Sequence, residues 1–168
     1  MNRWRRWARH LWLDADDARR ALDDAAMQRL QQRVQDSERR HGGEIRVVVE
    51  ASLPWAELRR GTSARDRALA LFGQLGVWDT EANNGVLVYL LLADRAIEIV
   101  ADRGLSRHVP PRHWDEVLGD MRAAFRCGQF EAGLAQALQR VDEVLVRHFP
   151  LQAGQANPNE LPDAPRIG

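Results

Sequence analysis

The chain has 168 residues, of which 45% are hydrophobic, and this is enough for one ordinary core but too little for two domains. Its 24 basic and 24 acidic residues give a formal net charge of zero, which excludes a global attraction to nucleic acid, so we expect no nucleic-acid partner. One cysteine excludes an internal disulfide framework, and the longest apolar run, residues 86–93, is shorter than the roughly 20 residues of a membrane span, so we expect a cytoplasmic protein.

Residues 1–19 form a basic, Trp-rich leader. Trp4, Trp7 and Leu11 recur at helical spacing, and the other faces carry the arginines Arg3, Arg5, Arg6 and Arg9. Tryptophan with arginine on one helix suits an anionic membrane surface, and a tryptophan stripe equally suits packing on the edge of a core. Two alternatives stay open, which are peripheral contact with the inner face of a membrane and packing of the leader on the domain.

The domain proper, residues 20–149, opens with a helix that ends at a glycine pair before a β-branched strand, residues 44–50. Ser63 followed three residues later by Asp66 has the form of a capping box, so a second helix should begin there and run to about residue 75. We expect Leu69 to lie on the buried face of this second helix.

A β-hairpin follows, and its apolar character is the sharpest secondary-structure signal in the chain. Residues 86–92 are fully apolar, residues 96–101 form a second apolar-rich run, and a tight turn at 93–95 joins them. Continuous hydrophobicity predicts a hairpin in the centre of the sheet with both faces covered. Two amphipathic helices come next, and the Pro-, Asn- and Gly-rich segment 150–168 should form an extended or disordered tail.

The order helix, strand, helix, hairpin, helix, helix implies a right-handed parallel crossover. The predicted fold is therefore an α/β domain with a small mixed sheet and helices on both faces. This topology brings the starts of two parallel strands and the end of the returning hairpin strand to one edge. The polar residues expected at that edge are Glu44, Arg46, Asp79, Glu81, Asn83, Asn84, Asp102 and Arg103.

Carboxylate and amide oxygens are the ligands that Ca²⁺ and Mg²⁺ take in proteins. The sequence therefore predicts a divalent metal site formed by Asp79, Asn83, Asn84 and Asp102, with Glu44, Arg46, Asp94, Glu98 and Arg103 as further candidates. The alternative is a solvated loop rim, because acids and asparagines are common turn residues.

Glu98 interrupts an otherwise apolar strand, and a carboxylate in that position must be paired, metal-bound or on the less covered face. An ion pair with a helix arginine, Arg65 or Arg67, is favoured over a catalytic role. Cys127 is favoured as a small core thiol over a nucleophile, which needs an adjacent base. The sequence contains no nucleophile elbow, P-loop or dinucleotide fingerprint, so it identifies no catalytic residue.

Several segments together resemble the TPM domain family, and the resemblance covers about residues 20–148. The most specific part is the hairpin, with Asn-Gly-Val-Leu at 84–87 and Asp-Arg at 94–95. The other matching segments are residues 44–49, 65–72, 78–80, 101–104 and 125–133. The resemblance implies a Rossmann-like three-layer α/β/α sandwich.

Membership would also imply functions. Some members of this family bind calcium in an acidic pocket, and plant thylakoid members are linked to acid phosphatase activity and photosystem repair. The positions of this sequence that correspond to the family pattern are Asp79, Asn83, Asn84, Asp94 and Asp102.

Three functional hypotheses follow, in order of preference. The first is a divalent-metal-binding regulatory or assembly module, with a protein partner such as a membrane protein. The second is a module that binds a protein or a membrane surface through the Trp/Arg leader. The third is a metal-assisted phosphatase, in which Arg103 or Arg46 would clamp the phosphate.

Overall fold

A four-stranded mixed sheet forms the middle layer of the computed structural model, which describes residues 3–152 and 154–168. The strands lie in the order β3-β2-β1-β4, and β1 pairs in parallel with β2 and β4 whereas β2 and β3 are antiparallel. Their bounds are β1 Glu44–Glu50, β2 Gly85–Leu91, β3 Ala96–Ala101 and β4 Arg166–Ile167.

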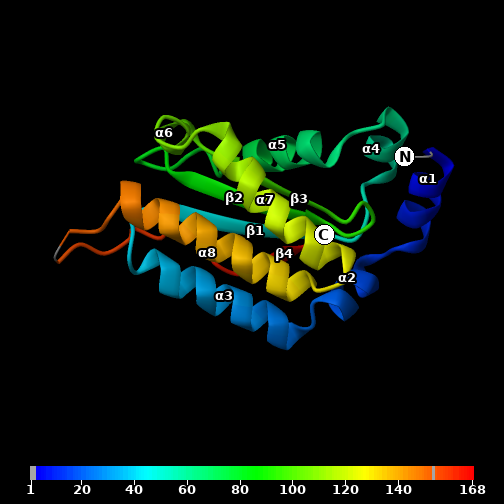
Figure 1. Cartoon of the computed structure of the whole chain (residues 1–168), viewed down its shortest axis with the longest axis horizontal. Coiled ribbons are helices and arrows are strands. Elements are labelled where there is room, and N and C mark those ends of the chain that lie inside the picture. The colour runs from blue at the N-terminus through cyan, green and yellow to red at the C-terminus, as the bar shows by residue number, and fades with distance from the viewer. Residues whose placement is uncertain (1–2, 153) are drawn as a thin grey trace.

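The described helices cover both faces of the sheet (Figure 1). They are α1 Arg3–Trp12, α2 Ala15–Ala21, α3 Asp24–Glu38, α4 Trp55–Arg60, α5 Ala64–Gln74, α6 Arg103–Ser106, α7 Pro111–Arg126 and α8 Phe130–His148. Helices α3, α7 and α8 pack on one face, and α4 and α5 pack on the other. This arrangement confirms the predicted α/β fold with helices on both faces.

Each face of the sheet has its own buried cluster, because successive strand residues point to opposite sides. Val47 and Val88 contribute to the cluster under α3, α7 and α8. Val48 and Leu87 contribute to the cluster under α4 and α5. Every residue of β2 is buried, which explains its uninterrupted apolar sequence. The expectation that the whole hairpin lies in the centre of the sheet is wrong for β3, because β3 is an edge strand and three of its six residues are only partly buried.

The capping box at the start of α5 forms as predicted, with Ser63 and Asp66 each accepting a hydrogen bond from the backbone of the other. The expected burial of Leu69 is wrong, because this side chain is 48% exposed while Ala68 and Leu71 face the sheet. The expectation that Cys127 is a core thiol is also wrong, because it is exposed just after α7.

The tail beyond α8 runs back along β1 and ends in β4, a strand that the sequence pattern does not predict. Arg166 and Ile167 pair with Val48 and Val49, and the N–H of Gly168 donates to the Val49 carbonyl over 2.9 Å. A two-residue strand is too short to show any periodicity. Within the described part of the chain, none of the helices combines the length and apolar character that crossing a bilayer requires.

Candidate functional site

The starts of β1 and β2 and the end of β3 lie together at one end of the strands, as the topology predicts, and this end is the edge described below. Glu44, the first residue of β1, pairs with Gly85, the first residue of β2. On the other side of β2, the N–H of Asp102 donates to the Gly85 carbonyl over 2.9 Å. Glu44 and Asp102 therefore flank the start of β2, and Asn84 directly precedes it.

Two glycines allow the loop between α5 and β2 to pack against this edge. A Cβ on Gly85 would collide with the carbonyl oxygen of Val77, and a Cβ on Gly104 would collide with the carbonyl oxygen of Asn83. The N–H of Gly104 also donates to that Asn83 carbonyl over 2.9 Å. The absence of both side chains thus holds the polar loop 78–84 close to the strand ends.

Asn84 is almost fully buried, with 1% of its surface exposed. Its backbone N–H donates to the Thr80 hydroxyl over 3.0 Å, and its side-chain NH₂ donates to the Gly42 carbonyl over 2.7 Å. The Oδ1 of the same amide is buried and has no hydrogen-bond partner. An unpaired buried acceptor costs about 1–3 kcal/mol, so this oxygen calls for a proton donor, a water or a cation.

Asp102 shows the same feature across the β2–β3 ladder. It is 6% exposed and caps α6, because its Oδ1 accepts the N–H of Arg103 over 2.6 Å. Its Oδ2 is buried without a hydrogen-bond partner. The edge therefore holds two oxygens of the type that divalent cations bind, each on a side chain whose orientation is fixed by another hydrogen bond.

Glu44 has a third unpaired oxygen, Oε1, while its Oε2 accepts the N–H of Leu161 over 3.1 Å. Burial raises the pKa of Glu44 above its ordinary value. Burial also raises the pKa of the neighbouring Glu38 to about 8, with the charges of Glu44 and Asp163 adding to the effect against the lowering by the Ile45 N–H. With a pKa of about 8, Glu38 keeps its proton at neutral pH, and a protonated carboxyl is a poor metal ligand.

The remaining predicted edge residues separate. Asp79 and Asn83 are exposed in the loop before β2, and Asn83 has a left-handed backbone with φ of 52°. Arg103 is exposed as the first residue of α6. Arg46 donates to the carbonyls of Pro162 and Ala164 in the tail, so its guanidinium is engaged in holding the tail.

Asp94 does not belong to this edge, and its inclusion among the site candidates is corrected by the structure. It lies in the β2–β3 turn, at the opposite end of β2 from Gly85. Arg6 donates to both of its oxygens, and His10 Nε2 lies 3.2 Å from its Oδ1. Burial opposes ionisation, but the hydrogen bonds from His10 and Arg6 outweigh it and lower the pKa of Asp94 to about 2.

Glu98 forms the predicted ion pair with α5, since its Oε2 lies 3.7 Å from an Arg65 nitrogen. The other arginine considered for it, Arg67, instead forms two hydrogen bonds with the buried carboxylate of Glu50. The hydroxyl of Tyr89 donates to the same carboxylate over 2.7 Å. Glu98 therefore acts in an ion pair between β3 and α5.

A buried Ser–His–Asp group was not found from the sequence. Ser37 Oγ lies 2.8 Å from His41 Nε2 and 2.8 Å from Asp142 Oδ1. Serine stands between the other two, whereas in a hydrolytic triad histidine stands between serine and acid. His41 is fully buried and Ser37 is 3% exposed, so a substrate could not reach them, and the group joins α3 to α8.

Among the side chains that the structure describes, no group of three or more His, Cys, Asp and Glu is placed to hold a metal ion. A cation at the edge would therefore depend on one carboxylate, Asp102, together with asparagine and backbone oxygens.

Comparison with known proteins identifies the family. The TPM domain sequence model matches residues 15–144, and no curated protein matches the chain. The solved BA42 protein of the psychrophilic bacterium Bizionia argentinensis is 26% identical with a TM-score of 0.75, over 88% of this chain and 95% of that one. The N-terminal domain of a P. gingivalis protein is 25% identical with a TM-score of 0.64, over 78% and 82%. Since the family model covers most of the chain and the folds agree, the chain belongs to the TPM domain family.

Proposed function

We propose that the chain is a divalent-cation-binding module, with Ca²⁺ as the preferred ion, and that the cation binds at the β2–β3 edge. The observation that carries the proposal is the pair of buried oxygens without hydrogen-bond partners, Asn84 Oδ1 and Asp102 Oδ2. A cation bound at this edge would pair such an oxygen and remove the cost of leaving it unpaired.

Both side chains are oriented before any ion arrives. The Asn84 amide is held by its bond to the Gly42 carbonyl, and the Asp102 carboxylate is held by its cap on the Arg103 N–H. Asp102 lies opposite Gly85, the residue that follows Asn84, because the Asp102 N–H donates to the Gly85 carbonyl. A preorganised pair of oxygens loses little side-chain entropy when it binds an ion.

The donor set favours Ca²⁺ over Mg²⁺. Calcium accepts six to eight oxygens in a flexible arrangement that includes amides, backbone carbonyls and water, whereas Mg²⁺ requires a near-ideal octahedron. Asp79 and Asn83 in the adjoining loop supply further oxygens of these kinds at the solvent side. One buried carboxylate implies weak binding, with a dissociation constant on the order of 10⁻⁴–10⁻³ M.

A regulatory or assembly role fits this site better than a phosphatase. A metal-assisted phosphatase needs a cationic clamp on the phosphate beside the metal. Arg46, one of the two arginines considered for that task, already holds the tail through the carbonyls of Pro162 and Ala164. The buried Ser37 would need a base in a different arrangement to act as a nucleophile.

Thermal unfolding after EDTA treatment, followed by addition of millimolar Ca²⁺ or Mg²⁺, tests the proposal. Millimolar Ca²⁺ is about 1–10 times such a dissociation constant and adds about 0.4–1.4 kcal/mol, which corresponds to a Tm increase of roughly 1–6 °C for a chain of this size. Asp102→Asn keeps the cap on α6 but removes the charge, so the Ca²⁺ shift should disappear. Asp36→Asn, at an exposed carboxylate on α3, is the matched control and should retain the shift.

The absence of any Ca²⁺ shift in the unmodified chain would contradict the proposal. An equal shift in Asp102→Asn would also contradict it, because the ion would then bind elsewhere. Calorimetric titration of the same two variants separates direct binding of the ion from a general salt effect on stability.

A further inference from the structure

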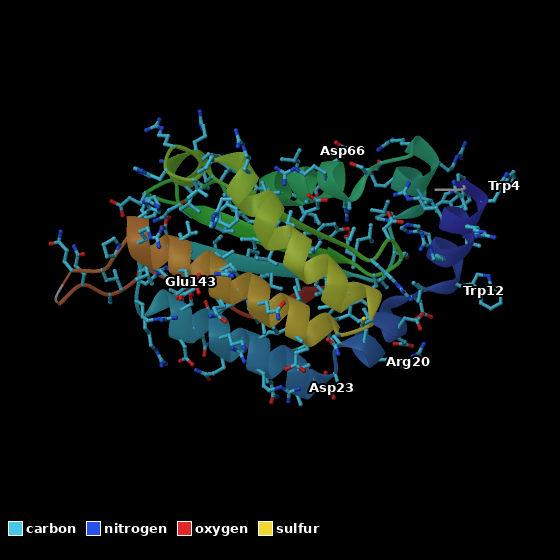
Figure 2. The ribbon with its side chains drawn as sticks, in the orientation of Figure 1. Trp4, Trp12, Arg20, Asp23, Asp66 and Glu143 are labelled. Atoms are coloured by element: carbon cyan, nitrogen blue, oxygen red, sulfur yellow. The ribbon has the colours of Figure 1, made fainter. Side chains whose placement is uncertain are left out.

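Helix α1 presents an aromatic face to solvent. Trp4 is 80% exposed, Leu11 63% and Trp12 86%. Figure 2 shows Trp4 and Trp12 projecting away from the body of the molecule at the end where the chain begins. Trp55 of α4 is 52% exposed at the same end and lies edge-on to Trp7, with ring centroids 5.2 Å apart. Several large apolar side chains exposed together mark an interaction surface.

The opposite face of α1 anchors the helix to the domain. Arg6 donates to the Asp94 carboxylate and to the Thr62 carbonyl, the latter over 2.7 Å. His10 is buried, and its Nδ1 accepts the N–H of Leu53 over 3.0 Å. A ten-residue helix is marginal in isolation, so these contacts both form the helix and hold its tryptophans outward.

The surface around this aromatic face is positively charged. Helix α1 contains no acidic residue, and its Arg5 and Arg9 lie at positions next to the exposed face. The acids that follow in α2 are balanced locally, because Asp16 pairs with Arg19 and Asp17 pairs with Arg20. Arg6 and Arg9 of α1 form ion pairs with Asp94, and Arg5 lies exposed beside the aromatic face.

A cavity between α1 and α4 adds a place for an anionic group. Its volume is about 380 Å³, and it lies beside the exposed Trp55. Three of its lining residues are arginines and two are apolar, in the set Arg6, Trp7, Leu58, Arg59, Arg60 and Gly61. Arg6 forms an ion pair with Asp94 and Arg60 forms one with Glu57, so the exposed Arg59 is the lining arginine that we expect to meet a phosphate attached to a hydrocarbon.

We infer that the outer surface of α1 and α4 docks on an anionic phospholipid bilayer. The tryptophans would enter the headgroup boundary, where an apolar ring with a polar N–H is most stable, and the arginines would contact lipid phosphates. An interfacial helix carries these two residue types side by side. Helix α1 lies before residue 15, where the match to the TPM domain begins, whereas α4 lies within the matched residues.

Co-sedimentation of the full chain with vesicles tests the inference. Vesicles of equal parts phosphatidylglycerol and phosphatidylcholine are compared with pure phosphatidylcholine vesicles, at about 0.15 M and about 1 M salt. The chain should bind the anionic vesicles at the lower salt and be released at the higher salt. A blue shift of tryptophan fluorescence should accompany binding.

Two sets of variants locate the contact. The double variant Trp4→Ala/Trp12→Ala should weaken vesicle binding at least about tenfold, because two interfacial rings are lost. Each of Arg5→Gln and Arg59→Gln should weaken it on the order of fivefold, which corresponds to one arginine near an anionic surface. Trp78→Ala removes a tryptophan that is 54% exposed at a different site and should bind like the unmodified chain.

The melting temperature of each variant must match that of the unmodified chain, so that loss of binding is not loss of fold. Failure to bind anionic vesicles would overturn the inference. Binding that persists in Trp4→Ala/Trp12→Ala would overturn it as well. If the chain is instead a dimer in solution and this double variant is a monomer, the surface is an interface between copies and the bilayer is not its partner.

Discussion

Glu38 offers a sharp test of how the buried acids of this fold are held. It is the last residue of α3 and is 5% exposed, and its Oε1 accepts the N–H of Ile45 over 2.9 Å. An ionised Glu38 would be a buried negative charge that faces Glu44 and Asp163. It would also lie beside the partial negative charge at the C-terminal end of α3, which repels it. These effects explain why the pKa of Glu38 rises from 4.5 to about 8.

The raised pKa determines the pH dependence of folding. The folded chain keeps the Glu38 proton up to about pH 8, whereas the unfolded chain loses it above 4.5. This group therefore contributes its full stability below pH 4.5, and that stability is lost as the pH rises through 8. At about pH 7.5 the unfolded chain has released the proton, and the unfolding free energy is then about 4 kcal/mol lower than it is below pH 4.5.

Glu38→Gln should remove this cost, because glutamine has the shape of a protonated glutamate. Its oxygen can still accept from Ile45, and its NH₂ can still donate to Asp163. At about pH 7.5 we expect a gain of about 3–4 kcal/mol and a Tm increase of roughly 6–16 °C. At about pH 4 the variant and the unmodified chain should have the same stability, because both carry a neutral group there.

Urea unfolding at a series of pH values measures both the pH dependence of the unfolding free energy and the gain in stability of the Glu38→Gln variant. Glu143→Gln, at an exposed residue on α8, is the matched control and should change stability by less than about 0.5 kcal/mol at any pH. A destabilised Glu38→Gln variant at about pH 7.5, with a pH-independent unmodified chain between about pH 6.5 and 8, where His41 no longer titrates, would refute the reasoning. Glu38 would then be ionised in the folded protein.

Three further predictions concern other parts of the fold. Burial lowers the pKa of His41 from 6.5 to about 4, so its contribution is complete above pH 6.5 and is lost toward pH 4. In the Glu38→Gln variant, where the opposite titration of Glu38 is absent, the loss should reach about 3 kcal/mol, and a stability that stays constant between about pH 6.5 and 4 in that variant would contradict it. The Cβ added by Gly85→Ala would collide with the Val77 carbonyl, so this variant should destabilise the fold by several kcal/mol. Gly73→Ala adds its Cβ in open space on α5 and should stabilise the fold by about 0.5–1 kcal/mol. Denaturant midpoints compare the two variants. Asp94→Asn leaves Arg6 without its partner and should cost about 3–5 kcal/mol in the same assay, and a change below about 1 kcal/mol would mean that α1 is held by other contacts.

The elements that the sequence predicts well are those with a strong local signal. Strand β2 is found because every one of its residues is buried, and α5 is found because Ser63 and Asp66 form its capping box. Helices α4 and α6 and strand β4 span six, four and two residues, which is too few for a period to appear. The length of an element thus decides whether its pattern can be read.

The candidate site was partly predictable for a topological reason. A parallel crossover followed by a hairpin must bring Asn84 and Asp102 to one edge, and the structure places them there. Asp94 entered the candidate set through the family resemblance, although its place in the hairpin turn puts it at the other end. The Ser37–His41–Asp142 group could not be predicted, because 105 residues separate Ser37 from Asp142 and no pattern links them.

The two proposed surfaces lie at opposite ends of β2. The cation edge is at Gly85, near α6, and α1 is held by the turn that follows Leu91 (Figure 1). Seven residues of strand separate the two ends, which corresponds to about 20 Å. This exceeds the Debye length of about 8 Å at physiological salt, so a cation at the edge contributes little to the field at the lipid.

The two activities should therefore be independent, and their variants should be additive. Asp102→Asn should abolish the Ca²⁺ shift and leave vesicle binding unchanged, whereas Trp4→Ala/Trp12→Ala should do the reverse. The comparison uses the same thermal and sedimentation assays on both variants and their combination. If Asp102→Asn weakened vesicle binding in the presence of Ca²⁺, the ion would have to bridge the protein to lipid, and the edge at Gly85 would have to face the bilayer in place of α1.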